Sequence, residues 1–377
     1  MLRNARPYTG WIRVIKRPPL VRFVLNTTAN PQDDAFGWLE YVSGIKKVGV
    51  DFLRSRGHLK SPDDSFYLFQ SFIRQARAFY ISAAALEPRS SPLNYYYAFL
   101  NLAKAYILVH QPQFTGRNSN HGLGFKLRKG GLSKQFVTSA KSGVFANFYR
   151  QVTGVQLAKN VDMNIVNLLG HCSDISYEYQ TGKFGARRMS RGHIAIATDN
   201  NECWVVISLQ QFEGLEKYRI SLEAFHRLVE EVSVFSHQAR ELFEIVAEHK
   251  SEFRFFQSRI AYRRGAEQSI PIAKIIREWS DAVGHLLTVA PYDDAMDFQL
   301  DFPLKLSEQL SIKEPVAIYA LMYFLSSLVR YNPDFLESLL ASRDSWILER
   351  FMRAAPVTLL LYMRNLIEGV NCAYKSR

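Results

Sequence analysis

The stretch that decides the fold is residues 61–110, SPDDSFYLFQSFIRQARAFYISAAALEPRSSPLNYYYAFLNLAKAYILVH. It opens with a helix-start signal, Ser61-Pro62-Asp63-Asp64, in which a capping residue precedes a proline and two acids of the first turn. Apolar side chains then recur at spacings of three and four, which predicts a helix over about 62–86. A more apolar helix is predicted over 93–109. Because only a short break separates them, the two helices should pack as an antiparallel hairpin.

Other elements are predicted on both sides of this hairpin. The pair Asn30-Pro31 is a second helix start, and residues 111–134 lose the helical period and become a long Gly-rich basic loop. The strongest β-hairpin signal has Asp199-Asn200-Asn201 as its turn, between two β-rich runs. The remaining predicted elements are short strands or an arm at 10–25, a strand at 296–302, and helices at 31–54, 221–250, 314–330, 334–350 and 356–370.

These elements predict an α+β fold that is predominantly α-helical. Its parts are an N-terminal helical hairpin, a central β-hairpin region and a C-terminal helical bundle. We expect a basic, mainly helical region over 1–160, a mixed α/β region over 161–310 and a helical region over 311–377. The three regions can also form one continuous unit.

Charge is distributed very unevenly along the chain. The 377 residues are 47% hydrophobic and 22% charged, which excludes intrinsic disorder and a disulfide scaffold, and the net charge is +12. Residues 1–150 hold 22 Lys and Arg against 7 Asp and Glu, whereas residues 151–377 hold 25 against 28. The span from 88 to 161 has no acidic residue and ten basic ones. The sequence therefore predicts a basic surface formed by this span.

The sequence also favours a compartment and excludes several kinds of site. Basic residues interrupt the N-terminal stretch before an apolar run of signal-peptide length can form. The longest apolar run, 315–329, is shorter than a bilayer span. Cys172, Cys203 and Cys372 are an odd, widely spaced set without metal-ligand spacing. We expect a cytoplasmic protein with no cofactor, no metal and no membrane contact.

Basic residues in and around the acid-free span are candidates for phosphate binding. Glycines punctuate the loop after residue 111, so its backbone can approach a phosphate that the side chains neutralise. Lys104 shares a helix face with Asn101, and a buried lysine needs a partner from the fold or from a ligand. The candidate nucleic-acid contacts are Lys104, Arg117, Lys126, Arg128, Lys129, Lys134, Arg187, Arg188 and Arg191. The alternatives are a solvated loop, a lysine that reaches out to water, and an amphipathic element with one wet face.

Two histidines are candidates for acid–base chemistry. If RNA were cleaved here, His121 or His110 would act as general acid or base, and Arg117 would stabilise the charge that develops on the phosphate. The alternative is that both histidines are structural, with His121 holding a turn before Gly122. The sequence has no P-loop, G-x-G-x-x-G, G-x-S-x-G or H-E-x-x-H motif, so it names no reaction class.

Two long segments resemble the YaaC-like family of bacterial proteins. The first comprises FIRQARAFY at 72–80, SPLNYYYAFLNLAKA at 91–105 and His121-Gly122, and the second is YALMYFLSSLVRYNP at 319–333. Because the likeness touches both halves of the chain, it implies that the whole chain is one family unit. It implies a bacterial cytoplasmic protein and little about chemistry.

The helical hairpin with a histidine-bearing loop is also similar in style to the HEPN superfamily, which includes RNases of toxin and antiviral systems. Those nucleases carry Arg, four to six residues and then His on a helix. Here only three residues separate Arg117 from His121, in a Gly-rich segment.

Three functions are therefore open. The first is a nucleic-acid-associated component of a bacterial defence or stress module, which binds DNA or RNA through its basic N-terminal half. The second is a HEPN-like, metal-independent ribonuclease. The third is a non-catalytic scaffold, in which the aromatic-rich segment 314–370 binds a partner protein or a second copy of the chain.

Overall fold

The structure is a computed structural model in which the chain divides into two compact units. The described residues are 23–27, 30–116, 120–158, 160–199, 201–210, 227–231, 253–283, 288–289, 291, 299–303, 305–307 and 310–375. We call the units the helical unit, from the described parts of 28–188 and 309–369, and the sheet unit, from the described parts of 1–27, 189–308 and 370–377. The α+β, predominantly helical class predicted from the sequence is confirmed.

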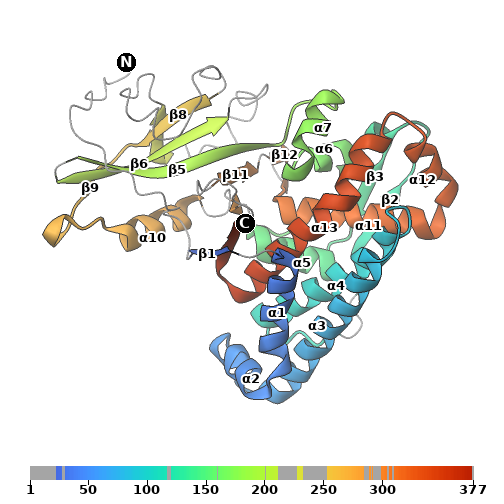
Figure 1. Cartoon of the computed structure of the whole chain (residues 1–377), viewed down its shortest axis with the longest axis horizontal. Helices are drawn as coiled ribbons and strands as arrows, with labels where there is room; N and C mark the ends of the chain where they lie inside the picture. The colour runs from blue at the N-terminus through green and yellow to red at the C-terminus, as the bar shows by residue number, and fades with distance from the viewer. Residues whose placement is uncertain are drawn as a thin grey trace. The chain divides into compact units, whose positions relative to one another are not determined.

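The helical unit contains ten α-helices within the described residues, and a small sheet (Figure 1). Its helices are α1 (Pro31–Gly44), α2 (Lys46–Ser55), α3 (Pro62–Ala84), α4 (Ser91–His110), α5 (Val144–Thr153), α6 (Ile165–Leu169), α7 (Ser176–Thr181), α11 (Glu314–Tyr331), α12 (Pro333–Leu340) and α13 (Ser345–Glu368). Its strands β2 (Leu123–Lys126), β3 (Phe136–Ser139) and β4 (Val161–Asn164) form an antiparallel sheet in the order β2-β3-β4, and β13 (Leu310–Ser311) precedes α11.

Helices α4 and α11 form the centre of the helical unit. Most side chains of α4 are buried, and fourteen of the first fifteen residues of α11 are buried, which is typical of helices that are apolar on all sides. Helix α4 packs against α3 as the predicted hairpin and also against α11, α13 and α5. A polar residue on α4 or α11 therefore stands out, because it lies in or beside a core.

The sheet unit is built around an antiparallel sheet with the path β10-β11-β5-β6-β8-β7, and β9 also pairs with β6. Its elements are β1 (Phe23–Thr27), β5 (Met189–Asp199), β6 (Glu202–Gln210), β7 (Val229–Glu231), β8 (Phe253–Ser258), β9 (Tyr262–Arg263), α10 (Ile272–Val283), β10 (Thr288–Val289), β11 (Gln299–Pro303), β12 (Lys305–Ser307) and β14 (Asn371–Lys375). Asp199 pairs with Glu202, so the predicted β-hairpin is confirmed. Strands β1 and β14 pair in parallel.

Several predicted boundaries are wrong, for local reasons. The single helix expected over 31–54 is two helices, because Ile45 adopts an extended conformation between α1 and α2. The break expected before residue 356 is absent, since α13 runs through Pro356. Proline inside a helix costs about 3 kcal/mol, and the buried residues around Pro356 stabilise the continuous helix.

Other predictions fall wholly or partly on residues outside the described set. Within 221–250, predicted to be helical, residues Val229–Glu231 form the strand β7, and most of the rest lies outside the described residues. The strand expected over 296–302 overlaps β11, whose described part begins at Gln299. The long loop expected over 111–134 contains β2.

Candidate anion site on helices α4 and α11

A polar stripe runs along one face of the otherwise apolar helix α4. Tyr97, Asn101 and Lys104 lie at spacings of four and three, so their side chains share that face. The Asn101 side-chain amide donates to the Tyr97 carbonyl at 2.9 Å. Lys104 is half-buried, its Nζ lies 5.8 Å from the centroid of the Phe72 ring, and burial lowers its pKa. The helix thus holds a lysine ammonium beside its apolar core.

His121 is held next to this stripe by the turn that precedes β2. The Tyr96 hydroxyl lies 2.9 Å from His121 Nδ1, and the His121 carbonyl accepts from the Phe145 N–H at 3.1 Å. Gly122 follows with a φ of +74° and lies against the Ser142 carbonyl, where a Cβ would clash, so the turn requires glycine. Burial lowers the pKa of His121, and the nearby charges of Lys104 and Arg330 lower it further. His121 is therefore largely neutral at pH 7.

Arg330, in the last turn of α11, completes the group. Its Nη1 donates to the Tyr97 hydroxyl at 2.8 Å, and its guanidinium lies 4.8 Å from the centroid of the exposed Tyr331 ring. The Tyr97 ring in turn stacks on Phe79 at a centroid distance of 5.3 Å. We refer to Lys104, His121 and Arg330 as the basic cluster. Its side chains come from α4, α11 and the loop between α4 and β2.

Buried tyrosines fix the position of the basic cluster. Tyr96, which holds His121, packs its ring against Tyr319 and Tyr323 at centroid distances of 5.8 and 5.3 Å. The Tyr323 hydroxyl donates to the Leu123 carbonyl of β2 at 2.9 Å. Burial raises the pKa of Tyr96, Tyr319 and Tyr323, so all three hydroxyls stay neutral. This packing ties α4, α11 and β2 together behind the cluster.

Among the described residues, the basic cluster has no acidic partner. Within the described part of the chain, none of its three side chains forms an ion pair with a carboxylate. Elsewhere in the helical unit, the basic side chains of Lys126 and Arg89 do form ion pairs, with Asp162 at 2.7 Å and Glu337 at 2.8 Å. The cluster can thus donate several hydrogen bonds and positive charge to an anion from outside the protein.

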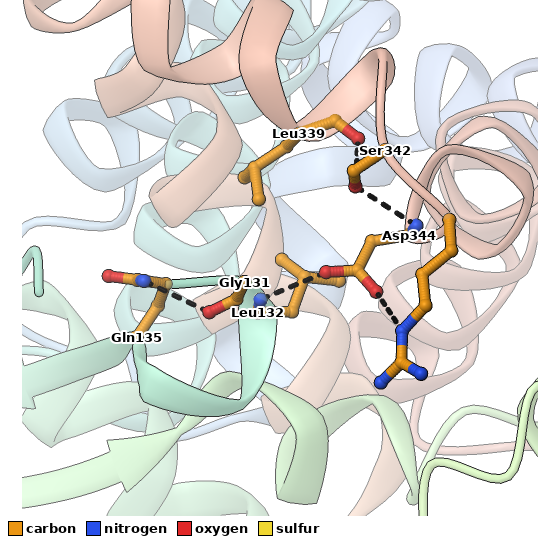
Figure 2. Close-up of polar contacts among 7 residues, drawn as sticks. Gly131, Leu132, Gln135, Leu339, Ser342 and Asp344 are labelled. Carbon is orange, nitrogen blue, oxygen red and sulfur yellow. Dashed lines mark hydrogen bonds and ion pairs between the residues drawn. The ribbon is translucent and has the colours of Figure 1, made fainter. Parts of the chain in front are cut away.

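The glycine-rich basic segment after the cluster is an ordered part of the fold. Gln135 is fully buried, and its side-chain amide donates to the carbonyls of Arg128, Gly130 and Gly131 at 2.9 to 3.0 Å. The Leu132 N–H donates to the buried Asp344 carboxylate at 3.0 Å. Figure 2 shows the segment joined through these contacts to the residues before α13. These contacts hold the segment in the fold, and the Leu132 N–H is bonded to Asp344 rather than available to a phosphate.

The basic side chains of this segment differ in their contacts and exposure. Lys126 is ion-paired with Asp162, the first acidic residue after the acid-free span. A span without acidic residues in the sequence can therefore still contact one in the folded chain. Arg128 lies over the Phe136 ring at 4.8 Å. Lys129 and Lys134 are exposed. Arg117 lies outside the described residues.

The other predicted contacts are not part of the basic cluster. Arg187 is only 6% exposed and lies over the Tyr179 ring, and the half-buried Arg188 donates to Asn167 at 2.8 Å. This placement does not fit the surface role expected of Arg187. Arg191 lies on β5, and its side chain is not described. His110 ends α4 with its ring 4.6 Å from that of Tyr106, so this contact is not with His121.

Sequence reasoning missed two features. Arg330 was not singled out, although it lies in the segment 319–333 that carries the family resemblance and is seven residues from Tyr323 on the same helix face. His171 was also missed. It is 1% exposed, and the charges of Arg188 and Arg187 combine with burial to lower its pKa to about 3. Glu314, 2% exposed, lies close to this group and accepts hydrogen bonds from Ser173 and Tyr362.

No group of three or more His, Cys, Asp or Glu among the described residues could hold a metal ion. In the same part of the chain, no helix has both the length and the apolar character needed to cross a bilayer.

The observations define an α+β protein whose helical unit carries a basic, tyrosine-lined site. A family model described as YaaC-like Protein matches residues 52–367, and the chain therefore belongs to the YaaC-like family. The matched residues include all of the basic cluster. No curated protein and no solved structure matches the chain.

Proposed function

We propose that this protein binds nucleic acid and that the basic cluster is its phosphate contact. The observation that carries the proposal is the meeting of Lys104, His121 and Arg330 without a carboxylate partner within the described residues. Uncompensated positive charge beside an apolar core is costly, and a phosphate would compensate it. The exposed Lys129 and Lys134 add long-range attraction for a polyanion.

The aromatic side chains around the cluster favour a single-stranded ligand. Tyr331 is 62% exposed under the Arg330 guanidinium, and the half-buried Tyr97 stacks on Phe79. Grooves that bind single strands combine basic side chains with aromatic rings on which bases stack. We extend the proposal to a place in the bacterial cytoplasm and a role in a defence or stress module. The cytoplasm is what the resemblance to the YaaC-like family implies, and the defence role comes from the similarity in style to the HEPN superfamily.

Fluorescence anisotropy with labelled single- and double-stranded DNA and RNA, across a sodium chloride series, tests the proposal. Affinity should fall as salt rises, because phosphate contacts release counterions. The double variant Lys104→Gln/Arg330→Gln should weaken binding by at least about tenfold, whereas Lys47→Gln/Arg353→Gln removes the same charge from exposed sites elsewhere. Absence of binding at low salt, or equal weakening by the two double variants, contradicts the proposal.

A second candidate is a metal-independent ribonuclease, favoured by the contact between Tyr96 and His121. The Tyr96 hydroxyl fixes the imidazole through Nδ1, and the lowered pKa leaves His121 able to accept a proton near neutral pH. Incubation of total RNA with EDTA, with wild type and with His121→Gln, tests this function. Cleavage that the variant loses supports it, and no cleavage, or equal cleavage by both proteins, removes it.

A further inference from the structure

Two members of the basic cluster are held close together, because the rings of Tyr96 and Tyr97 lie 5.8 Å apart, and the charge of Lys104 also acts on the His121 ring. Adjacent residues of α4 hold two of its members, since the Tyr96 hydroxyl contacts His121 and the Tyr97 hydroxyl accepts from Arg330. Lys104 lies two turns along the same helix face as Tyr97. A row of basic side chains follows a strand and meets successive phosphates one at a time. Neighbouring donors from different elements can instead bind a single group with several charges and several acceptor oxygens.

The number of charges matches a phosphate monoester better than a phosphodiester. Lys104 and Arg330 supply two positive charges, and His121 supplies a ring nitrogen, Nε2, that Tyr96 does not occupy. A phosphodiester inside a strand carries one negative charge, whereas a phosphate monoester carries about −1.5 to −2 at pH 7 and has three strong acceptor oxygens. Lys104 strengthens the match, because it is half-buried beside Phe72 and needs more compensation than an exposed lysine.

We propose that the basic cluster recognises the terminal phosphate monoester of a nucleic-acid strand. The proposal rests on the proposed function and names the part of the ligand that the site selects. Tyr97, which accepts from Arg330 and stacks on Phe79, lies where the sugar or base next to that phosphate would approach. The exposed Tyr331 ring offers a second surface for a base on the other side of Arg330.

The test compares one single-stranded 12-mer in three forms, with a 5′-phosphate, with a 3′-phosphate, and with hydroxyl groups at both ends. Anisotropy competition should show that one phosphorylated form binds about tenfold tighter than the hydroxyl form. Lys104→Gln and, separately, Arg330→Gln should reduce this advantage to less than about twofold. Lys47→Gln, which removes an exposed lysine elsewhere in the chain, should keep it. Circular dichroism and thermal melting confirm that each variant folds.

Three outcomes contradict different claims. Equal affinity for all three strands, with salt-dependent binding intact, overturns the terminal-phosphate proposal and leaves nucleic-acid binding standing. No binding of any strand overturns the proposed function itself. Adenosine 5′-monophosphate is the further competitor. If it displaces the phosphorylated strand at equal concentration, the ligand is a nucleotide and the strand is not recognised.

Discussion

The helical unit contains two histidines that stand beside two basic side chains each, and they differ in almost every other respect. His121 is exposed at its turn, contacts the Tyr96 hydroxyl and has Lys104 and Arg330 as neighbours. His171 is buried, and neither ring nitrogen has a hydrogen-bond partner among the described residues. Its basic neighbours are Arg187 and Arg188. In both cases, burial and the two positive charges lower the pKa of the imidazole.

The difference lies in what balances the positive charge. Near His171 the protein supplies its own acid, because the buried Glu314 carboxylate accepts from the N–H of Ser173, two residues along the chain. Near His121, no carboxylate within the described residues contacts the cluster. A closed cluster with an internal acid needs no ligand to balance its charge, whereas an accessible cluster without an acid among the described residues is suited to an anionic ligand.

The largest expected effect comes from removing the internal acid. Glu314 accepts from the Ser173 N–H at 2.5 Å and from the Tyr362 hydroxyl at 2.6 Å. Glu314→Ala leaves these buried donors without that acceptor, and it should lower the free energy of unfolding by about 3–5 kcal/mol in urea denaturation. The control is Glu337→Ala, which breaks the exposed pair with Arg89 and should cost at most about 1 kcal/mol. Equal losses of unfolding free energy in Glu314→Ala and Glu337→Ala would contradict the structural role given to Glu314.

The second prediction concerns acid stability. His171 has a pKa of about 3 in the folded protein against about 6.5 when unfolded. Its contribution to stability is therefore fully present above pH 6.5 and declines as the pH falls toward 3. The loss is about 1.4 kcal/mol per pH unit. Urea denaturation of wild type and His171→Gln between pH 7 and 5 should show a shallower decline for the variant, by about 2 kcal/mol over this range. Parallel declines would show that His171 already carries a proton in the folded state.

A paired substitution separates the two clusters directly. Arg330→Gln removes an exposed charge, so it should weaken binding of a single-stranded oligonucleotide about tenfold and leave stability within about 0.5 kcal/mol. Arg187→Gln changes a buried side chain and should do the reverse, with a stability loss of about 2–4 kcal/mol and affinity within about twofold. Anisotropy and thermal melting of the same preparations give both values. If Arg187→Gln lost affinity and Arg330→Gln did not, the phosphate contact would lie at the arginines beside His171, which contradicts its assignment to the basic cluster.

The same comparison shows how far the sequence could lead. The helical hairpin and the β-hairpin were predictable, because periodicity, prolines and turn residues act over short distances. Arg187 and Arg188 were predicted as surface contacts because adjacent arginines look like a basic patch. In the structure Arg187 is buried over the Tyr179 ring and Arg188 bonds to Asn167, and a pair of adjacent arginines does not reveal these contacts.

The basic cluster itself was only half predictable. Lys104 and His121 were identified from a lysine on an apolar helix and from a histidine in a basic loop. Arg330 belongs to the same cluster through the packing of α11 on α4, which no spacing in the sequence encodes. The absence of acidic residues from the span suggested more unpaired positive charge than the loop has, since Asp162 on β4 pairs with Lys126 on β2 across β3. Charge counts along the chain therefore locate the region but do not separate paired from unpaired side chains.

The smallest expected effect is a pH dependence of binding that belongs to His121 alone. The groups around its ring are the neutral Tyr96 hydroxyl and the basic side chains of Lys104 and Arg330, which lower its pKa in the free protein. A bound phosphate opposes these charges and raises that pKa, so binding takes up a proton and strengthens as the pH falls. Lowering the pH can only add charge at Lys104, which acts in the same direction.

The phosphate monoester also titrates near pH 6, so the quantity to measure is the ratio of wild-type affinity to that of His121→Gln. This ratio should rise about threefold between pH 7.5 and 6.0, because a third positive charge reaches the ligand only in the wild type. A constant ratio would mean that His121 holds the turn and does not meet the phosphate.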